Sequence, residues 1–196
     1  MILASRNPHK VREFGEIEGL PKIEPLPEWV ELPPEDAVTF AGNALGKARA
    51  AWEATGEEAI ADDSGLVVDG LDGAPGVRSA RFAGEGATDA ENLESLIESL
   101  ESVPIGSRTA RYVCAIAHVA SDGAEQVVEG VCEGILITKP RGSGGFGYDP
   151  IFVPSDTGRS DARTMAELSP SEKHAISHRG RAARLLAERL SGSRYP

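Results

Sequence analysis

Two adjacent carboxylates, Asp62 and Asp63, follow a short apolar run and precede Ser64 and Gly65. Two acids where a strand ends in a Ser-Gly loop suit a metal site or a general base at the edge of a sheet. Because successive side chains of a strand point to opposite faces, we expect one carboxylate to contact the ligand and the other to support it. The alternative is an Asx-type turn that ends the strand.

The segment Ser5-Arg6-Asn7-Pro8-His9-Lys10 joins an apolar run to a predicted helix that begins at Asn7 and Pro8. Cations in the first turn of a helix oppose its dipole, at a cost of about 0.3–1 kcal/mol each. A bound phosphate reverses that sign, because the free N–H groups, the dipole and Lys10 then all face the anion. The segment therefore indicates a phosphate site or, alternatively, an ordinary exposed first turn. It is not a Walker loop, since no Gly-Lys-Ser/Thr occurs.

A glycine-rich segment, Gly144 to Pro150, carries two aromatic residues and one acid. Glycines let a backbone approach a ligand closely. Phe146 and Tyr148 are suited to stacking on a base, and Asp149 is suited to accepting a hydrogen bond from a ring N–H. A hairpin turn with packed aromatic side chains is the alternative.

A basic segment runs from Lys173 to Arg181 and contains His174 and His178 four residues apart. That spacing suggests zinc, but the Glu of the metalloprotease pattern His-Glu-x-x-His is missing. The basic groups instead favour an anion or a carbonyl acceptor as ligand. A solvated basic helix face is the alternative.

Composition sets the class of protein. The 196 residues suffice for one domain, with or without two lobes, and 40% hydrophobic with 26% charged residues is ordinary for a soluble globular chain. The net charge of −11 argues against non-specific binding to nucleic acid. No apolar run of about 18 residues and no signal-peptide pattern occur, so we expect no membrane span. Cys114 and Cys132 lie in apolar segments, which predicts buried free thiols and a cytoplasmic protein.

Hydrophobic periodicity and turn residues predict the elements that position these groups. Strands are expected at 1–5, 59–61, 66–68 and 151–153, with at most one short strand in the proline-rich stretch 21–34. A long hairpin is expected from 108–120 and 126–138. Helices are expected after Asn7, at 39–55, after the capping box of Thr88 and Glu91, and from the capping box of Ser169 and Glu172 to about Leu190. This alternation favours an α/β domain with a mixed sheet.

Taken in order, these segments resemble the inosine-triphosphate pyrophosphatase family, also called non-canonical purine NTP pyrophosphatases, from Ser5 to about Ala183. The motifs that carry the resemblance are Asp62-Asp63-Ser64-Gly65-Leu66, Gly73-Ala74-Pro75-Gly76-Val77 with Ser79-Ala80-Arg81, Phe146-Gly147-Tyr148-Asp149-Pro150, and Ser177-His178-Arg179-Gly180.

The resemblance implies an α/β fold in which an elongated, twisted mixed sheet and its helices form two lobes around a central substrate cleft. The whole chain, 1–196, would be a single pyrophosphatase domain acting as a homodimer. It would hydrolyse ITP, dITP and XTP to the monophosphate and pyrophosphate, and so keep these nucleotides out of DNA and RNA.

The resemblance also implies roles for individual residues. Asp63 would be general base and Mg²⁺ ligand, Glu35 a second Mg²⁺ ligand, and Asp62 a support. The substrate-binding residues it implies are Ser5, Arg6, Asn7, Pro8, His9, Lys10, Lys47, Ser64, Phe146, Gly147, Tyr148, Asp149, Lys173, His178 and Arg179.

One position departs from the family pattern. Relatives often read Thr-Phe-x-Glu-Asn-Ala, whereas this chain has Gly42 after Thr39-Phe40-Ala41. The missing Glu removes a capping-box partner for Thr39 or an acid near the metal, which puts metal affinity in question. Two other functions remain open: a pyrophosphatase of related fold for pyrimidine triphosphates, and a nucleotide sensor without catalysis.

Overall fold

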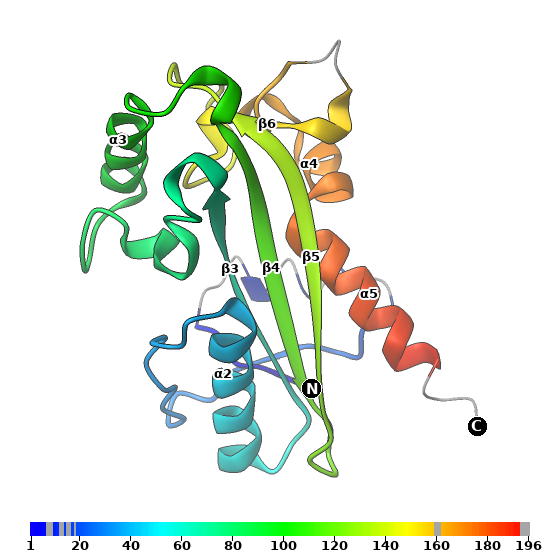
Figure 1. Ribbon diagram of the computed structural model, residues 1–196. Coiled ribbons are helices and arrows are strands. Elements are labelled where there is room, and N and C mark those ends of the chain that lie inside the picture. Colours follow the sequence, from blue (N-terminus) through cyan, green and yellow to red (C-terminus); the bar gives the residue numbers. More distant parts are fainter. Residues whose placement is uncertain (7–9, 12–13, 15–16, 18, 159–161, 193–196) are drawn as a thin grey trace. The chain divides into compact units, whose positions relative to one another are not determined.

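The computed structural model describes residues 1–6, 10–11, 14, 17, 19–158 and 162–192 (Figure 1). One sheet has the strand order β2-β1-β3-β4-β5-β6. The strands are β1 Ile2–Leu3, β2 Glu24–Pro25, β3 Ala59–Val68, β4 Thr109–Val119, β5 Glu125–Leu136 and β6 Phe152–Pro154. β1 pairs in parallel with β2 and β3, whereas β6 is antiparallel to β5. The predicted α/β class with a mixed sheet is confirmed, as is the single short strand in the proline-rich stretch.

Helices separate some of these strands and follow the last of them in the chain. The α-helices with defined bounds are α2 Phe40–Thr55, α3 Asp89–Leu100, α4 Pro170–Ile176 and α5 His178–Gly192. Short 3₁₀ helices span Asp69–Leu71, Gly76–Arg81, Ile105–Ser107, Asp149–Ile151, Ser155–Thr157 and Met165–Glu167. Within the described part of the chain, none of the helices has the length and apolar character needed to span a membrane.

The helix starts follow the predicted capping residues. Thr39 caps α2 by accepting a hydrogen bond from the backbone N–H of Gly42. Both predicted capping boxes are present, at Thr88 with Glu91 on α3 and at Ser169 with Glu172 on α4. Such a cap satisfies backbone N–H groups that the first turn leaves without partners, at a benefit of about 1 kcal/mol.

Two predicted boundaries are wrong. β3 runs unbroken from Ala59 to Val68, so the expected turn at Asp62–Gly65 does not occur. Nearly all of its residues are buried, as in a strand covered on both faces. The helix expected from Ser169 to Leu190 is two helices, because Ser177 has an extended backbone with φ −65° and ψ 148°. Serine side chains form local hydrogen bonds that compete with the helix, and Ser177 Oγ donates to the carbonyl of His174.

The chain forms two compact units, and the long strands β3, β4 and β5 contribute residues to both. The first unit comprises 1–63, 114–130 and 179–196, and the second 64–113 and 131–178. That the whole chain acts as one pyrophosphatase domain stays a prediction.

The first unit has its own hydrophobic core. Its buried members are Leu3, Phe14, Ile17, Ile60, Cys114, Ile116, Val128, Ala182, Ala183 and Leu186. In Figure 1, α2 lies to one side of the long strands and α5 to the other. Buried alanines, including Ala44, Ala48 and Ala51, line α2. Phe14 and Ile17 follow Asn7 in the segment predicted to be helical, and both are buried. Lys10, Val11 and Phe14 are helical and Ile17 is not, and several residues of this segment lie outside the described part of the chain.

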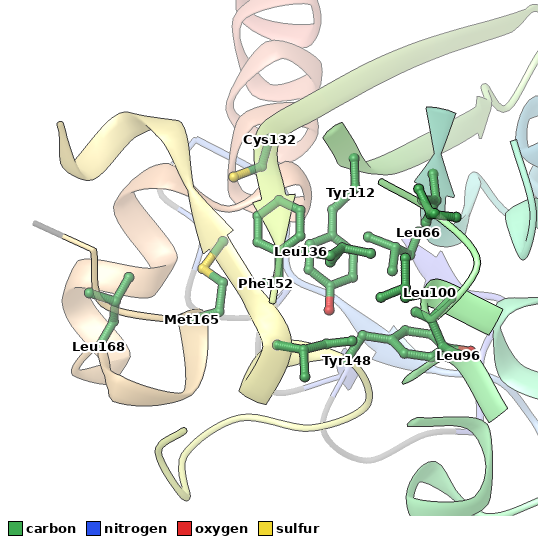
Figure 2. Close-up of a cluster of buried hydrophobic side chains, with 14 residues drawn as sticks. Leu66, Leu96, Leu100, Tyr112, Cys132, Leu136, Tyr148, Phe152, Met165 and Leu168 are labelled. Atoms are coloured by element: carbon green, nitrogen blue, oxygen red, sulfur yellow. The ribbon is translucent and has the colours of Figure 1, made fainter. Parts of the chain in front are cut away.

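The second unit packs around a separate core, drawn in Figure 2. The rings of Tyr112 and Phe152 lie beside each other there, with centroids 4.6 Å apart. Leu96 and Leu100 bring the apolar face of α3 into the same cluster. Cys132 is buried in this core and Cys114 in the first, and both are free thiols, as predicted.

Candidate functional site

Among the predicted site residues that the structure describes, Asp62 is the most deeply buried. Its carboxylate forms ion pairs with Lys10 Nζ at 2.8 Å and with Arg179 Nε at 3.3 Å, all three within the first unit. Burial raises the pKa of Asp62, but the two cations outweigh it and hold the pKa well below its usual range. Asp62 is therefore a permanent anion at neutral pH, and it fixes a lysine and an arginine in place.

Asp63 lies in a different environment, although it is the next residue. Asn43 of α2 donates from Nδ2 to Asp63 Oδ2 at 2.9 Å. Burial raises the pKa of Asp63, and the hydrogen bond from Asn43 and the charge of Lys47 only partly oppose that rise. The different partners match the expected alternation of a strand, with Asp62 facing Lys10 and Arg179 and Asp63 facing α2. A raised pKa suits a carboxylate that accepts a proton.

Lys47 connects the two acids to the segment before α2. It lies on α2, its side chain is almost fully buried, and its ammonium pairs with Glu35. The same Nζ donates to the backbone carbonyl of Asp62 at 2.7 Å. The negative charge of Glu35 also contributes to raising the pKa of Asp63, which places the two carboxylates within electrostatic reach. The first unit thus gathers two lysines, one arginine and three carboxylates around the middle of the buried strand β3.

This donor set fits magnesium better than a transition metal. Among the described residues, no group of three or more His, Cys, Asp or Glu side chains is arranged to hold a metal ion. Mg²⁺ does not require one, because it is usually bound through one or two carboxylates, waters and the phosphates of a substrate. Glu35 and Asp63 carry oxygen donors of this kind, and the ammonium groups of Lys10 and Lys47 lie beside Asp62 and Glu35. A magnesium and phosphate site at these residues stays a prediction.

The other residues predicted to bind phosphate lie in different environments, and three of them lie outside the described residues. Arg6 donates from one guanidinium nitrogen to the carbonyls of Val30 at 2.6 Å and Glu28 at 3.3 Å, which ties it to the proline-rich stretch. Ser5 and Arg6 line a cavity of about 410 Å³ in the first unit, together with Val11, Pro25, Leu26 and Glu28. Ser64 is half-buried within β3. Asn7, Pro8 and His9 lie outside the described residues, so their predicted roles stay predictions.

In the second unit, Asp149 organises the aromatic loop. Its Oδ2 accepts a hydrogen bond from the backbone N–H of Phe146 at 2.9 Å and pairs with Lys173 of α4. Its Oδ1 accepts from the hydroxyl of Tyr112 at 3.3 Å. Asp149 is buried, so these bonds hold its carboxylate in one orientation. The loop is further fixed at Gly147, whose N–H donates to Asp89 of α3 at 3.1 Å.

The aromatic residues of this loop differ from one another. Phe146 is 54% exposed, and Lys173 Nζ lies 4.7 Å from the centre of its ring. Tyr148 is buried in the core of the second unit, and its hydroxyl donates to the carbonyl of Ser79 at 2.7 Å. Tyr148 is therefore a packed aromatic side chain, as the alternative of a turn with packed aromatics predicted, whereas the ring of Phe146 lies at the surface. His178 stacks on Tyr112, with ring centroids 4.8 Å apart and planes at 12°.

Sequence analysis missed Asn43 and Tyr112. Asn43 is a polar residue in the first turn of a predicted helix, and no sequence pattern marks its contact with Asp63. Tyr112 lies in a β-branched strand where an aromatic residue is ordinary, and no sequence pattern marks its contacts with Asp149 and His178.

Comparison with known proteins gives consistent matches over nearly the whole chain. A model of the Ham1 family matches residues 1–189. A dITP/XTP pyrophosphatase of Geobacter sulfurreducens is 48% identical over 195 residues, covering 97% of this chain and 96% of the relative. The solved structure of a HAM1 protein from Coxiella burnetii has a TM-score of 0.88 at 43% identity, covering 97% of this chain and 98% of that chain. The Ham1 protein of Staphylococcus aureus gives a TM-score of 0.88 at 37% identity, with 98% of each chain covered.

Proposed function

The chain belongs to the Ham1 family, and from this premise we propose that it is a nucleoside-triphosphate pyrophosphatase. It hydrolyses ITP, dITP and XTP to the monophosphate and pyrophosphate, which removes these nucleotides from the pool used for DNA and RNA synthesis. The observation that carries the proposal is the pair of consecutive carboxylates with opposite settings: Asp62 neutralised by Lys10 and Arg179, and Asp63 held by Asn43 with a raised pKa.

We assign Mg²⁺ to Glu35 and Asp63. The bound ion would polarise the phosphoryl oxygens and position a water molecule. Asp63, a buried carboxylate, would accept the proton of the water that attacks the α-phosphorus. Asn43 keeps the carboxylate oriented while it does so.

Lys10 and Lys47 stabilise the negative charge that builds up on the departing pyrophosphate. Both ammonium groups are already fixed, by Asp62 and by Glu35 respectively, so little rearrangement is needed when the triphosphate binds. Fixed charges in a partly buried site act more strongly than the same charges in water. Arg179 is the second residue of α5 and is held by Asp62 as well.

The base is assigned to the loop of the second unit. Phe146, exposed and backed by Lys173, offers a ring for stacking. Asp149 is engaged by Phe146, Tyr112 and Lys173, so we assign it to holding this loop and not to facing a ring N–H. Hypoxanthine and xanthine carry a carbonyl acceptor at position 6, where adenine carries a donor. A donor from His178 or Arg179 would therefore accept the first two bases and oppose adenine, which can give discrimination of roughly 10⁴-fold.

Pyrophosphate release from ITP, XTP, GTP and ATP, each with Mg²⁺ and with EDTA, tests this proposal. We expect rapid release from ITP and XTP with Mg²⁺, little from ATP, and none with EDTA. Little release from GTP is expected from the resemblance to the family alone, because guanine carries the same carbonyl at position 6. Equal rates on all four nucleotides would refute the base assignment. Binding of ITP without release of pyrophosphate would refute the enzyme and favour a sensor.

The resemblance to the family also leads us to propose a cytoplasmic homodimer that binds no nucleic acid. The net charge of −11 supports the last point, because like charge opposes association with a phosphate backbone. Light scattering that gives twice the monomer mass is the expected result, and a monomer at micromolar concentration would contradict it.

A further inference from the structure

Asn43 joins two parts of the first unit that carry acidic residues. It is the fourth residue of α2 and is buried. Its Oδ1 accepts a hydrogen bond from the backbone N–H of Ala37 at 2.9 Å, and its Nδ2 donates to Asp63 Oδ2 at 2.9 Å. The acceptor of this amide therefore bonds to the segment before the helix, and its donor bonds to a carboxylate of β3.

The segment before α2 is held to that helix at a second point. Glu35, two residues before Ala37, pairs with Lys47, which lies one helical turn after Asn43 on the same face of α2. Glu35 and Asp63 are therefore each tied to α2, one through Lys47 and the other through Asn43. The position of Ala37 against the helix then decides how Glu35 lies relative to Asp63.

Gly42 permits this close packing. A Cβ at position 42 would lie 2.9 Å from the Cβ of Ala37 and 3.1 Å from Thr39 Oγ1, so the segment that carries Ala37 would have to move. Glycine inside a helix costs about 0.5–1 kcal/mol relative to alanine. The structure accepts that cost at a position where the N–H of Ala37 must come within hydrogen-bonding distance of Asn43.

We propose that Asn43 is a positioning residue for the metal site and that Gly42 is the residue that lets it act. Asn43 would hold Asp63 and the segment that carries Glu35 in place for a shared ion, through its hydrogen bonds to Asp63 and Ala37. The proposal rests on the proposed function, because Mg²⁺ and its two carboxylates are part of that function. It also gives the departure from the family pattern a meaning: without a side chain at position 42, the Glu35 segment packs directly on α2.

The chain contains a matched control for Asn43. Asn92 is likewise the fourth residue of its helix, α3, and is buried. Its Oδ1 accepts from the N–H of Ala83 at 2.9 Å, and its Nδ2 donates to the carbonyl of Ala80 at 3.1 Å. Replacing either asparagine by alanine removes the same two kinds of hydrogen bond, but only Asn43 bonds to a carboxylate that we assign to the metal.

The main test compares Asn43→Ala with Asn92→Ala in the full chain. With ITP as substrate, we expect Asn43→Ala to raise the Mg²⁺ concentration for half-maximal rate at least about tenfold, because residues that orient metal ligands typically change affinity by 10–100-fold. The KM for ITP at saturating Mg²⁺ should change less than threefold. Both variants should lower the unfolding midpoint by similar amounts. Asn92→Ala should leave the Mg²⁺ dependence unchanged.

A second readout needs neither metal nor substrate. The amide hydrogen of Ala37 should exchange with solvent at least about tenfold faster in Asn43→Ala than in the wild type, measured by NMR on the metal-free chain. Gly42→Ala should also speed this exchange and raise the Mg²⁺ requirement, although alanine is the better helix former. Adding Ala37→Gly removes the Cβ that would clash, so the double variant should recover wild-type values. These variants also decide the matter if Asn43→Ala does not fold.

The outcomes separate this inference from the proposed function. If the wild type hydrolyses ITP with Mg²⁺ but Asn43→Ala keeps the wild-type Mg²⁺ dependence, the positioning role is overturned and the function stands. Equal Mg²⁺ shifts in Asn43→Ala and Asn92→Ala would likewise overturn it, since they would reflect stability alone. A wild type that releases no pyrophosphate from ITP would overturn the function itself.

Discussion

At the scale of single residues, Asp62 and Asp63 show how neighbours on one strand acquire different chemistry. Burial disfavours the charge of both carboxylates. At Asp62 the paired cations Lys10 and Arg179 outweigh burial, so its pKa is lowered. At Asp63 the hydrogen bond from Asn43 and the nearby lysine charges do not outweigh it, so its pKa is raised. The alternation of strand side chains predicts that the two residues differ. It does not predict which residue meets Lys10 and Arg179, because those partners come from distant parts of the chain.

Replacing Asp63 by asparagine tests the catalytic assignment. Asn is nearly the same size and still accepts the hydrogen bond from Asn43, so the fold should survive. It cannot take a proton from water, and loss of a general base typically costs 10²–10⁴-fold. We therefore expect kcat with ITP to fall at least about 100-fold, with an unchanged circular dichroism spectrum. Asp69→Asn, at an exposed carboxylate, is the control. A variant that keeps more than half of the wild-type rate would exclude this role.

At the scale of elements, the sequence predicted those helix starts and strands that depend on contacts between neighbouring residues. The capping residues Thr39, Thr88 and Ser169 mark helix starts because their side chains bond to the first turn, and no distant contact is required. The long hairpin follows from β-branched runs joined by a tight turn.

The wrong boundaries arose where tertiary packing decides. Asp62-Asp63-Ser64-Gly65 has the composition of a turn, yet these residues continue β3 because Asp62 and Asp63 find partners on elements packed against it. The break at Ser177 likewise has only a weak local signal, a single serine in a helical pattern. Contacts of the site itself, such as Asn43 with Ala37, depend on the packing of a loop and could not be predicted.

The pairing of β5 with β6 gives a prediction at this scale. A Cβ at Gly134 of β5 would lie 2.5 Å from both the Phe152 ring and the carbonyl oxygen of Val153. Phe152 is fully buried, so the ring has little room to move. We expect Gly134→Ala to lower the free energy of unfolding by about 1–3 kcal/mol in urea titrations. Gly106→Ala, where a Cβ meets nothing within 4 Å, should change it by less than about 0.5 kcal/mol. Equal effects would contradict the packing argument.

At the scale of the whole molecule, each compact unit has its own apolar core, and the assigned metal ligands belong to neither. Glu35 and Asp63 are absent from both hydrophobic clusters, whose members are buried apolar side chains. Fully burying one leucine or phenylalanine contributes about 1.5–3 kcal/mol, so these clusters provide the main driving force for folding. Folding and metal binding should therefore be separable.

Removing metal should stop catalysis and preserve the fold. We expect EDTA to abolish pyrophosphate release from ITP, while the far-ultraviolet circular dichroism spectrum stays unchanged and the unfolding midpoint shifts by only a few degrees. Excess Mg²⁺ should restore the full rate within the mixing time. Loss of the spectrum on chelation would show that an ion is structural, which would contradict the separation of core and site.

The most direct test of the central claim is hydrolysis of ITP in ¹⁸O-labelled water, with the products identified by mass spectrometry. Attack of water at the α-phosphorus predicts inosine monophosphate carrying one ¹⁸O atom and unlabelled pyrophosphate, in equal amounts. Inosine diphosphate with labelled phosphate, or label in the pyrophosphate, would place the attack at another phosphorus and contradict the account.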